Sequence, residues 1–121
     1  MDSMTFEIST GGGPPVGAYK AKFLGAEATE HEEYGAGCKF VFEVASGNHS
    51  GEQATRITSA TPTPKNACGK MLAAISGESL RPGAKIDLAP HVGEVFLIQV
   101  EETPSGSTRV GTVIRSNEAF D

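Results

Sequence analysis

The side chains with the greatest capacity for chemistry in this sequence are an acidic run around one histidine, and two further histidines. Glu30-His31-Glu32-Glu33 offers the ligand types that bind a divalent metal, but it stands beside Gly35 and Gly37 and no second group of ligands accompanies it. An acidic surface loop is the favoured interpretation. His49 and His91 fall in expected turns, and neither has a carboxylate or nucleophile at a spacing that indicates acid–base catalysis. We therefore predict a protein that is not an enzyme and that needs no metal or cofactor.

Basic side chains form the second group of interest, because phosphate binding depends on lysine and arginine. The basic residues on the outward register of the first three expected strands are Lys20, Lys22, Lys39 and Arg56. Glu43 and Glu52 are the only acids in those strands, so four bases and two acids leave +2 locally on a chain whose net charge is −5. Such segregation is typical of a groove that binds phosphates weakly. The alternative is an ordinary solvated face whose lysines protect a sheet edge.

Aromatic side chains decide whether such a groove could also stack bases, a contact worth about 1–3 kcal/mol per base. The phenylalanines of the second and fourth expected strands fall on the inward register and are assigned to the core. Tyr34, in the first long loop, is the predicted stacking residue, with anchoring of that loop as the alternative role. Tyr19 and Phe23 could also serve if a bend at Gly25 turns one of them outward.

The elements that must position these residues follow from the spacing of apolar residues. Alternation predicts strands over residues 16–25, 38–44, 52–59, 94–102 and 108–115. In the third of these, Thr55 and Ile57 are expected to point inward and Arg56 outward. Gly25 suggests a bulge at the end of the first strand, and the acidic run is expected in the loop that follows.

One segment, residues 65–77, has helical spacing instead. Its apolar stripe consists of Cys68, Met71, Leu72 and Ile75. Thr63 is the predicted N-cap, Pro64 suits the first position of the helix, and Gly77 suits the residue after its end. Lys65 and Lys70 lie on this helix and are expected to flank a nucleic-acid site.

Three strands, one helix and two strands predict an all-β domain: a five-stranded Greek-key barrel of the OB type, with the helix between strands 3 and 4. The alternative fold is a β-sandwich with a helical insertion. The barrel is assigned to residues 16–115, after a flexible arm over residues 1–15 and before a tail over residues 116–121. The Gly-Pro run at residues 11–15 favours the arm.

Composition agrees with one globular domain of 121 residues, in which 15 glycines and 7 prolines predict many turns. The longest apolar run, at residues 95–98, is strand-sized, and the N-terminus lacks the pattern of a signal peptide. Cys38 and Cys68 are isolated, so we expect reduced thiols and a cytoplasmic protein without membrane association.

Several motifs carry a family resemblance between residues 16 and 115. They are Val16-Gly17-Ala18-Tyr19, then Lys39-Phe40-Val41-Phe42-Glu43-Val44 with Gly47 and Gly51, then Lys65-Asn66-Ala67-Cys68-Gly69-Lys70-Met71-Leu72, and Val92-Gly93-Glu94-Val95-Phe96. With them the chain resembles the small phage-type OB-fold single-stranded-DNA-binding proteins. That resemblance implies binding of single-stranded DNA with little sequence preference, in phage-type replication or recombination beside other proteins of those processes. It also implies a homo-oligomer built through strand edges.

A second function remains open from a different class. The acidic overall charge and the scarcity of outward aromatic side chains favour an OB-fold module that docks or assembles with other proteins and does not bind nucleic acid. Salt dependence separates the two, because release of counterions accompanies phosphate binding.

Overall fold

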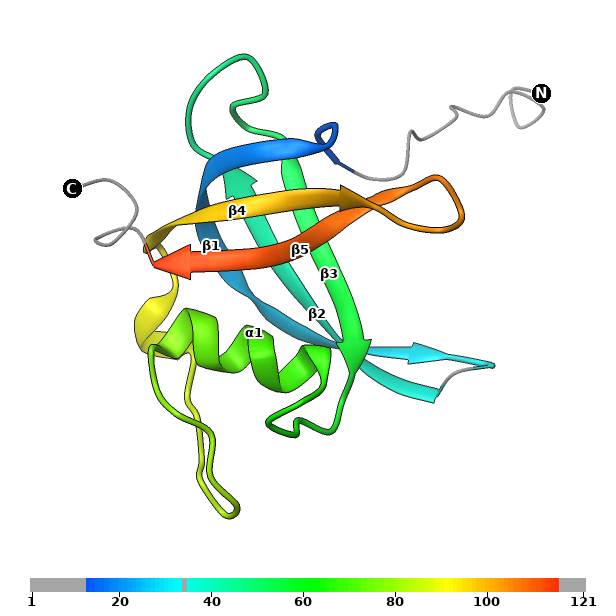
Figure 1. Cartoon of the computed structure of the whole chain (residues 1–121), viewed down its shortest axis with the longest axis vertical. Coiled ribbons are helices and arrows are strands. Elements are labelled where there is room, and N and C mark those ends of the chain that lie inside the picture. The colour runs from blue at the N-terminus through cyan, green and yellow to red at the C-terminus, as the bar shows by residue number, and fades with distance from the viewer. Residues whose placement is uncertain (1–12, 34, 116–121) are drawn as a thin grey trace, which may run out of the picture.

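Figure 1 shows the computed structural model of the chain, which describes residues 13–33 and 35–115. Five antiparallel strands form one sheet in the order β3-β2-β1-β4-β5. The elements in chain order are β1 (Gly17–His31), β2 (Gly35–Val44), β3 (Gln53–Ser59), helix α1 (Ala67–Ser76), the 3₁₀ turn η2 (Ala89–His91), β4 (Val95–Glu102) and β5 (Thr108–Arg115). The predicted order of three strands, a helix and two strands is therefore confirmed.

The sheet curls, but hydrogen bonds between strands do not close it. In Figure 1 β4 and β5 cross the other three strands, and β3 and β5 are the two edges of the strand order. These edges meet through a side chain: Arg56 Nη1 on β3 donates to the carbonyl oxygen of Val110 on β5 at 3.0 Å. Within the described residues, the structure is thus one curled sheet with a helix, and the ladder that would complete a barrel is absent.

The core lies between the inner face of this sheet and α1. Its buried members are Ala21, Phe23, Phe40, Phe42, Ala54, Cys68, Met71, Ile75, Phe96, Ile98, Val100, Val110 and Val113. Phe42 packs between two other rings, with centroids 5.4 Å from Phe23 and 6.3 Å from Phe96. Full burial of one such ring contributes about 1.5–3 kcal/mol, so these side chains hold the two crossing parts of the sheet together.

β1 is longer than predicted. The register between β1 and β2 shifts between Phe23 and Gly25, which confirms the bulge expected at Gly25. Beyond the bulge the strand continues to His31, so the acidic loop expected from Glu27 to Glu33 is shorter than predicted. Glu27 and Glu30 lie in the strand, opposite Lys39 and Ala36, and only Glu32 and Glu33 lie in the turn. Alanine and threonine fill this part of the strand, which gives no strong apolar alternation from which the sequence could predict it.

β3 has the opposite facing from the prediction. Ala54 is only 2% exposed, whereas Ile57, expected in the core, is 62% exposed. In the ladder Ala54 lies opposite Phe42 and Arg56 opposite Phe40, and both phenylalanines are buried. Arg56 tolerates the inward register because β3 is an edge strand, where the guanidinium reaches the Val110 carbonyl on β5.

Helix α1 begins later than predicted and ends as predicted. Asn66 is the N-cap, since its Oδ1 accepts a hydrogen bond from the Gly69 amide at 2.9 Å. Thr63 instead accepts from the amides of Lys65 and Asn66 and so stabilises the turn before the helix. Gly77 ends the helix in the left-handed conformation at φ 77°. The predicted stripe is confirmed, because Cys68, Met71 and Ile75 are buried and Leu72 is half-buried.

Most of the predicted arm, residues 1–12, and the predicted tail, residues 116–121, lie outside the described residues. The last part of that arm is described, and in it Pro14 is fully buried. Gly13 lies so close to β3 that a Cβ on it would be 2.9 Å from the carbonyl oxygen of Gln53. The chain therefore packs on the sheet from Gly13 onward.

Candidate nucleic-acid interface

The structure separates the predicted binding residues into two groups. The first, on the exposed face of β1 and β2, consists of Lys20, Lys22 and Lys39. The second, around the start of α1 and the adjoining strand β3, consists of Arg56, Lys65 and Lys70. Tyr34 lies outside the described residues, so its role in stacking stays a prediction.

The lysines of the first group alternate with carboxylates across the β1–β2 ladder. Lys22 lies opposite Glu43, and Lys39 lies opposite Glu27 with 4.0 Å between Nζ and Oε1. Glu43 and Lys39 are four residues apart on β2, so the two lysine positions are separated by about 13 Å along the strands. An ion pair this exposed is worth about 0–1 kcal/mol, so Lys39 can exchange Glu27 for another anion at little cost.

A hollow of about 310 Å³ opens on this face where the bulge interrupts β1. It is lined by Leu24, Gly25, Ala26, Glu27, Lys39, Val41 and Gln53. Most of its surface is polar, to which Glu27, Lys39 and Gln53 contribute, and Leu24 and Val41 supply a smaller apolar part. A Cβ built on Gly25 would meet no atom within 4 Å, which agrees with open space at the bulge.

The local charge on this face is smaller than the sequence predicts. Arg56 does not lie on it, because β3 turns that residue inward, while Glu27 joins it as part of β1. Glu52, counted in the prediction, precedes β3 and contacts His49 in the turn. The three lysines together with Glu27 and Glu43 therefore carry +1 rather than +2. A charge excess this small attracts phosphates only weakly.

Arg56 belongs instead to a charged cluster between the two edges of the sheet. We call it the seam cluster, and its members are Arg56 on β3, Glu101 on β4 and Arg109 on β5. The nearer contact is between Arg109 Nε and Glu101 Oε2 at 2.7 Å; Arg56 Nη1 lies 3.7 Å from the same oxygen. Burial, and then repulsion by Arg109, lower the pKa of Arg56 from its ordinary value. Arg109 was not among the predicted site residues. It lies in the predicted strand over residues 108–115, opposite Glu101 in the neighbouring strand, and opposite charges on adjacent strands were a signal that could have indicated it.

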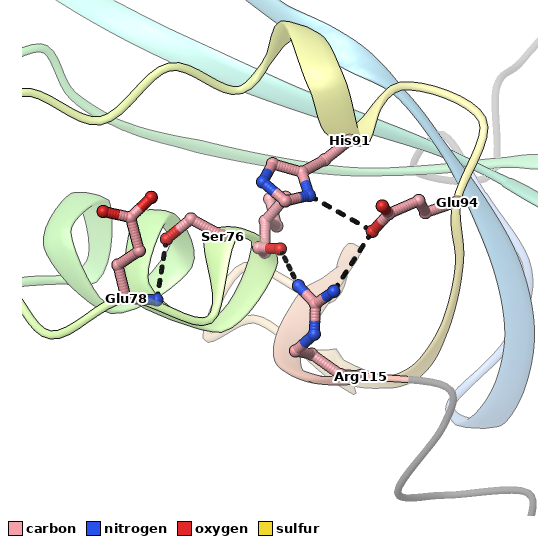
Figure 2. Close-up of polar contacts among 6 residues, drawn as sticks. Ser76, Glu78, His91, Glu94 and Arg115 are labelled. Carbon is pink, nitrogen blue, oxygen red and sulfur yellow. Dashed lines mark hydrogen bonds and ion pairs between the residues drawn. The ribbon is translucent and has the colours of Figure 1, made fainter.

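A second polar cluster fastens the C-terminal end of α1 to the sheet, as Figure 2 shows. Arg115 donates from Nη1 to the carbonyl oxygen of Ile75 and from Nη2 to Glu94 Oε1, which is 3.4 Å away. The guanidinium also lies 5.8 Å from the centre of the Phe96 ring. His91 Nδ1 contacts the same Glu94 oxygen at 3.2 Å. The cluster thus joins η2, β4, β5 and the last turn of α1. We assign it a structural role.

The two turn histidines do have carboxylate partners, contrary to the prediction. His49 lies 2.9 Å from Glu52 and His91 lies 3.2 Å from Glu94, each three residues further along the chain. In both turns the backbone amide of the glutamate also donates to the carbonyl oxygen of the histidine. These pairs therefore brace turns.

The described cysteines and acids offer no metal site. No group of three or more histidine, cysteine, aspartate or glutamate side chains gathers for a metal within residues 13–33 and 35–115. Cys38 and Cys68 are both free thiols, the first half-buried and the second buried. Burial, and then the neighbouring Cys68, raise the pKa of Cys38. No helix in the described part of the chain is both long and apolar enough to cross a bilayer.

Comparison with known proteins leaves the family open. No protein-family model matches the chain, and searches of curated proteins and of solved structures found no significant match.

Proposed function

We propose that this protein binds single-stranded DNA without catalysis, through the exposed face of β1, β2 and β3 around the bulge at Gly25. The observation that carries the proposal is the hollow at that bulge, a mainly polar depression in which the basic side chain of Lys39 lies near Leu24 and Val41. Single-strand binding surfaces combine a basic path for phosphates with apolar or aromatic contacts for bases.

The fold supports the same proposal. An OB barrel opened between its third and fifth strands has the strand order β3-β2-β1-β4-β5, which is the order found here. OB-fold proteins bind oligonucleotides on the face of strands 2 and 3, beside the loop between strands 1 and 2. We therefore assign the chain to a Greek-key OB fold and retain its resemblance to the phage-type single-stranded-DNA-binding proteins as part of the proposal.

In the proposed complex the lysines hold the backbone of the strand. Lys39 exchanges its exposed contact with Glu27 for a phosphate, and Lys22 and Lys20 hold phosphates further toward β4. Bases lie over Leu24 and Val41 in the hollow, and Tyr34 stacks on a neighbouring base. Such contacts read no base edge, so we expect little sequence preference and a role beside replication or recombination proteins.

The test is fluorescence anisotropy of a labelled mixed-sequence strand of about 30 nucleotides, titrated at several salt concentrations. Binding should weaken steeply as salt rises, because bound phosphates release counterions. The double substitution Lys22→Glu/Lys39→Glu should weaken affinity by at least about tenfold, since each lysine contacts a phosphate directly. Lys85→Glu, an exposed change outside this face, is the matched control. Absence of binding at low salt would refute the proposal.

A second function, docking of a protein partner, is favoured by one observation on the same face. Ile57, opposite Lys39 in the ladder, is 62% exposed, and Leu24 is 36% exposed. Large apolar side chains exposed on one face can serve as contacts for a protein partner. In that case the oligonucleotide titration gives no salt-dependent binding, and the protein alone or with a partner associates in a way that Ile57→Asp abolishes and Lys22→Glu does not.

A further inference from the structure

The seam cluster borders a cleft of about 210 Å³ where β3, β5 and the first turns of α1 meet. Its lining residues are Arg56, Ala67, Lys70, Met71, Glu101 and Gly111. A cleft of this size corresponds to roughly seven water volumes, enough for one small polyatomic anion. It is separate from the hollow at Gly25, with which it shares no lining residue.

Positive charge exceeds negative charge around this cleft. Arg56 and Lys70 line it and Arg109 stands behind Glu101, so three cations accompany one carboxylate and the local charge is +2. The Arg56 side chain is only 14% exposed, and water therefore screens its charge poorly. Burial is the main reason for the lowered pKa of Arg56, and repulsion by Arg109 adds to it.

Hydrogen-bond donors at the cleft remain available. Arg56 uses Nη1 for the Val110 carbonyl and stands 3.7 Å from Glu101, beyond hydrogen-bond distance. Lys70 has no ion pair with any residue of the described part of the chain, and its side chain is exposed. Ala67 is the first residue of α1, so the positive end of the helix dipole adds to the same field.

Glu101 stands where an added anion would compete. Its carboxylate rests against Gly111, at which a Cβ would clash with Glu101 Oε1. Glycine at this position of β5 thus lets the carboxylate approach both arginines. With 42% of its side chain exposed, Glu101 can swing outward and leave the arginines to a ligand that carries more charge.

We infer that this cleft binds one phosphate group, held by Arg56 and Lys70, with Arg109 reached once Glu101 moves aside. Arginine forks and lysine are the side chains that bind phosphate oxygens most strongly. The phosphate can belong to a free phosphate compound or to the backbone of a nucleic acid. The inference does not depend on the proposed function, because its residues lie outside the exposed face of β1 and β2.

The test follows backbone amide shifts by NMR while inorganic phosphate is added at constant ionic strength, with chloride as the balancing anion. Saturable shifts are expected at Ala67, Lys70 and Gly111. Lys70→Gln should weaken phosphate binding about tenfold, whereas the matched exposed change Lys85→Gln should leave it unchanged. Glu101→Gln should strengthen it about two- to fivefold, because the competing carboxylate is lost. A purely structural cluster would not predict that gain.

A second titration with a short single-stranded oligonucleotide assigns the source of the phosphate. Saturable shifts at the cleft with inorganic phosphate alone support a free phosphate compound. Shifts at the cleft with the oligonucleotide, weakened by Lys70→Gln and retained in Lys22→Glu/Lys39→Glu, support a phosphate of a strand. If neither probe gives saturable, Lys70-dependent shifts at the cleft, the inference is wrong, whatever the Gly25 face does.

Discussion

The side of the sheet that a charged residue faces in this protein depends on its partners on other strands as much as on its own polarity. Arg56 faces the buried side of β3 because it can donate a hydrogen bond to the carbonyl of Val110 there and lies near the carboxylate of Glu101. Lys39, on β2, faces the exposed side and has only the weak contact with Glu27. The same kind of charge therefore has a structural partner in one place and is free to change partners in the other.

A pH-dependent prediction belongs to Cys38, whose pKa is raised above its ordinary value by burial and by Cys68. The unfolded chain ionises this thiol near pH 8.5, whereas the folded chain keeps it neutral to higher pH. The free energy of unfolding therefore falls as the pH rises from the pKa of the unfolded chain through the raised pKa of the folded protein. Urea unfolding between pH 8 and 10 should show a steeper loss in the native protein than in Cys38→Ser. Equal slopes would show that Cys38 does not contribute.

At the scale of elements, the polar cluster of Figure 2 decides how firmly α1 is attached. Arg115→Ala should lower the free energy of unfolding by about 1–3 kcal/mol, because it removes the hydrogen bond to Ile75 and the contact with Glu94. Arg81→Ala, an exposed arginine in the loop after α1, is the control and should change stability by less than about 0.5 kcal/mol. Urea denaturation of both variants gives the comparison, and equal effects would mean that the cluster does not hold the helix.

The elements also show how far sequence reasoning reaches. β2 and β4 were predictable because large apolar residues such as Phe42 and Ile98 alternate with polar ones, and their burial confirms the pattern. β3 was not, because Ala54 is small and Ile57 is exposed, so an apolar count points to the wrong face. The N-cap was misplaced because Thr63 and Asn66 both have capping side chains, and only the three-dimensional turn selects between them.

The candidate sites divide in the same way. Alternation in β1 and β2 placed Lys22 and Lys39 on one exposed face, as the ladder confirms. The bulge at Gly25 was predicted, but neither the hollow beside it nor the cleft beside Glu101 was, because each is lined by residues distant from one another in the chain. The pairing of Arg56 with β5 spans 54 residues, beyond the reach of any local pattern.

For the whole molecule, the open seam between β3 and β5 predicts uneven protection from hydrogen exchange. From Gly37 to Glu43, β2 has a paired strand on each side, β1 and β3, while the outer amides of β3 and β5 face a seam without a ladder. The outer amides should exchange at least about tenfold faster than those of this part of β2 in the native state. Residue-resolved exchange measured by NMR tests this; equal protection at both edges would indicate a hydrogen-bonded closure in solution.

The central position of β1 also has a consequence for how the chain reaches this fold. β1, β2 and β3 pair with near neighbours in sequence, and β4 and β5 form a hairpin of their own. The two units pair in one ladder from Gly17 opposite Val100 to Lys22 opposite Val95, across more than half of the chain. Closing so long a loop costs conformational entropy before any contact between β1 and β4 forms. Contacts between residues distant in sequence therefore slow folding. The pairing of β1 with β4 should therefore be the late and rate-limiting event. A nascent chain released before Val95 would contain the first three strands but lack Phe96 and Ile98, two members of the buried core.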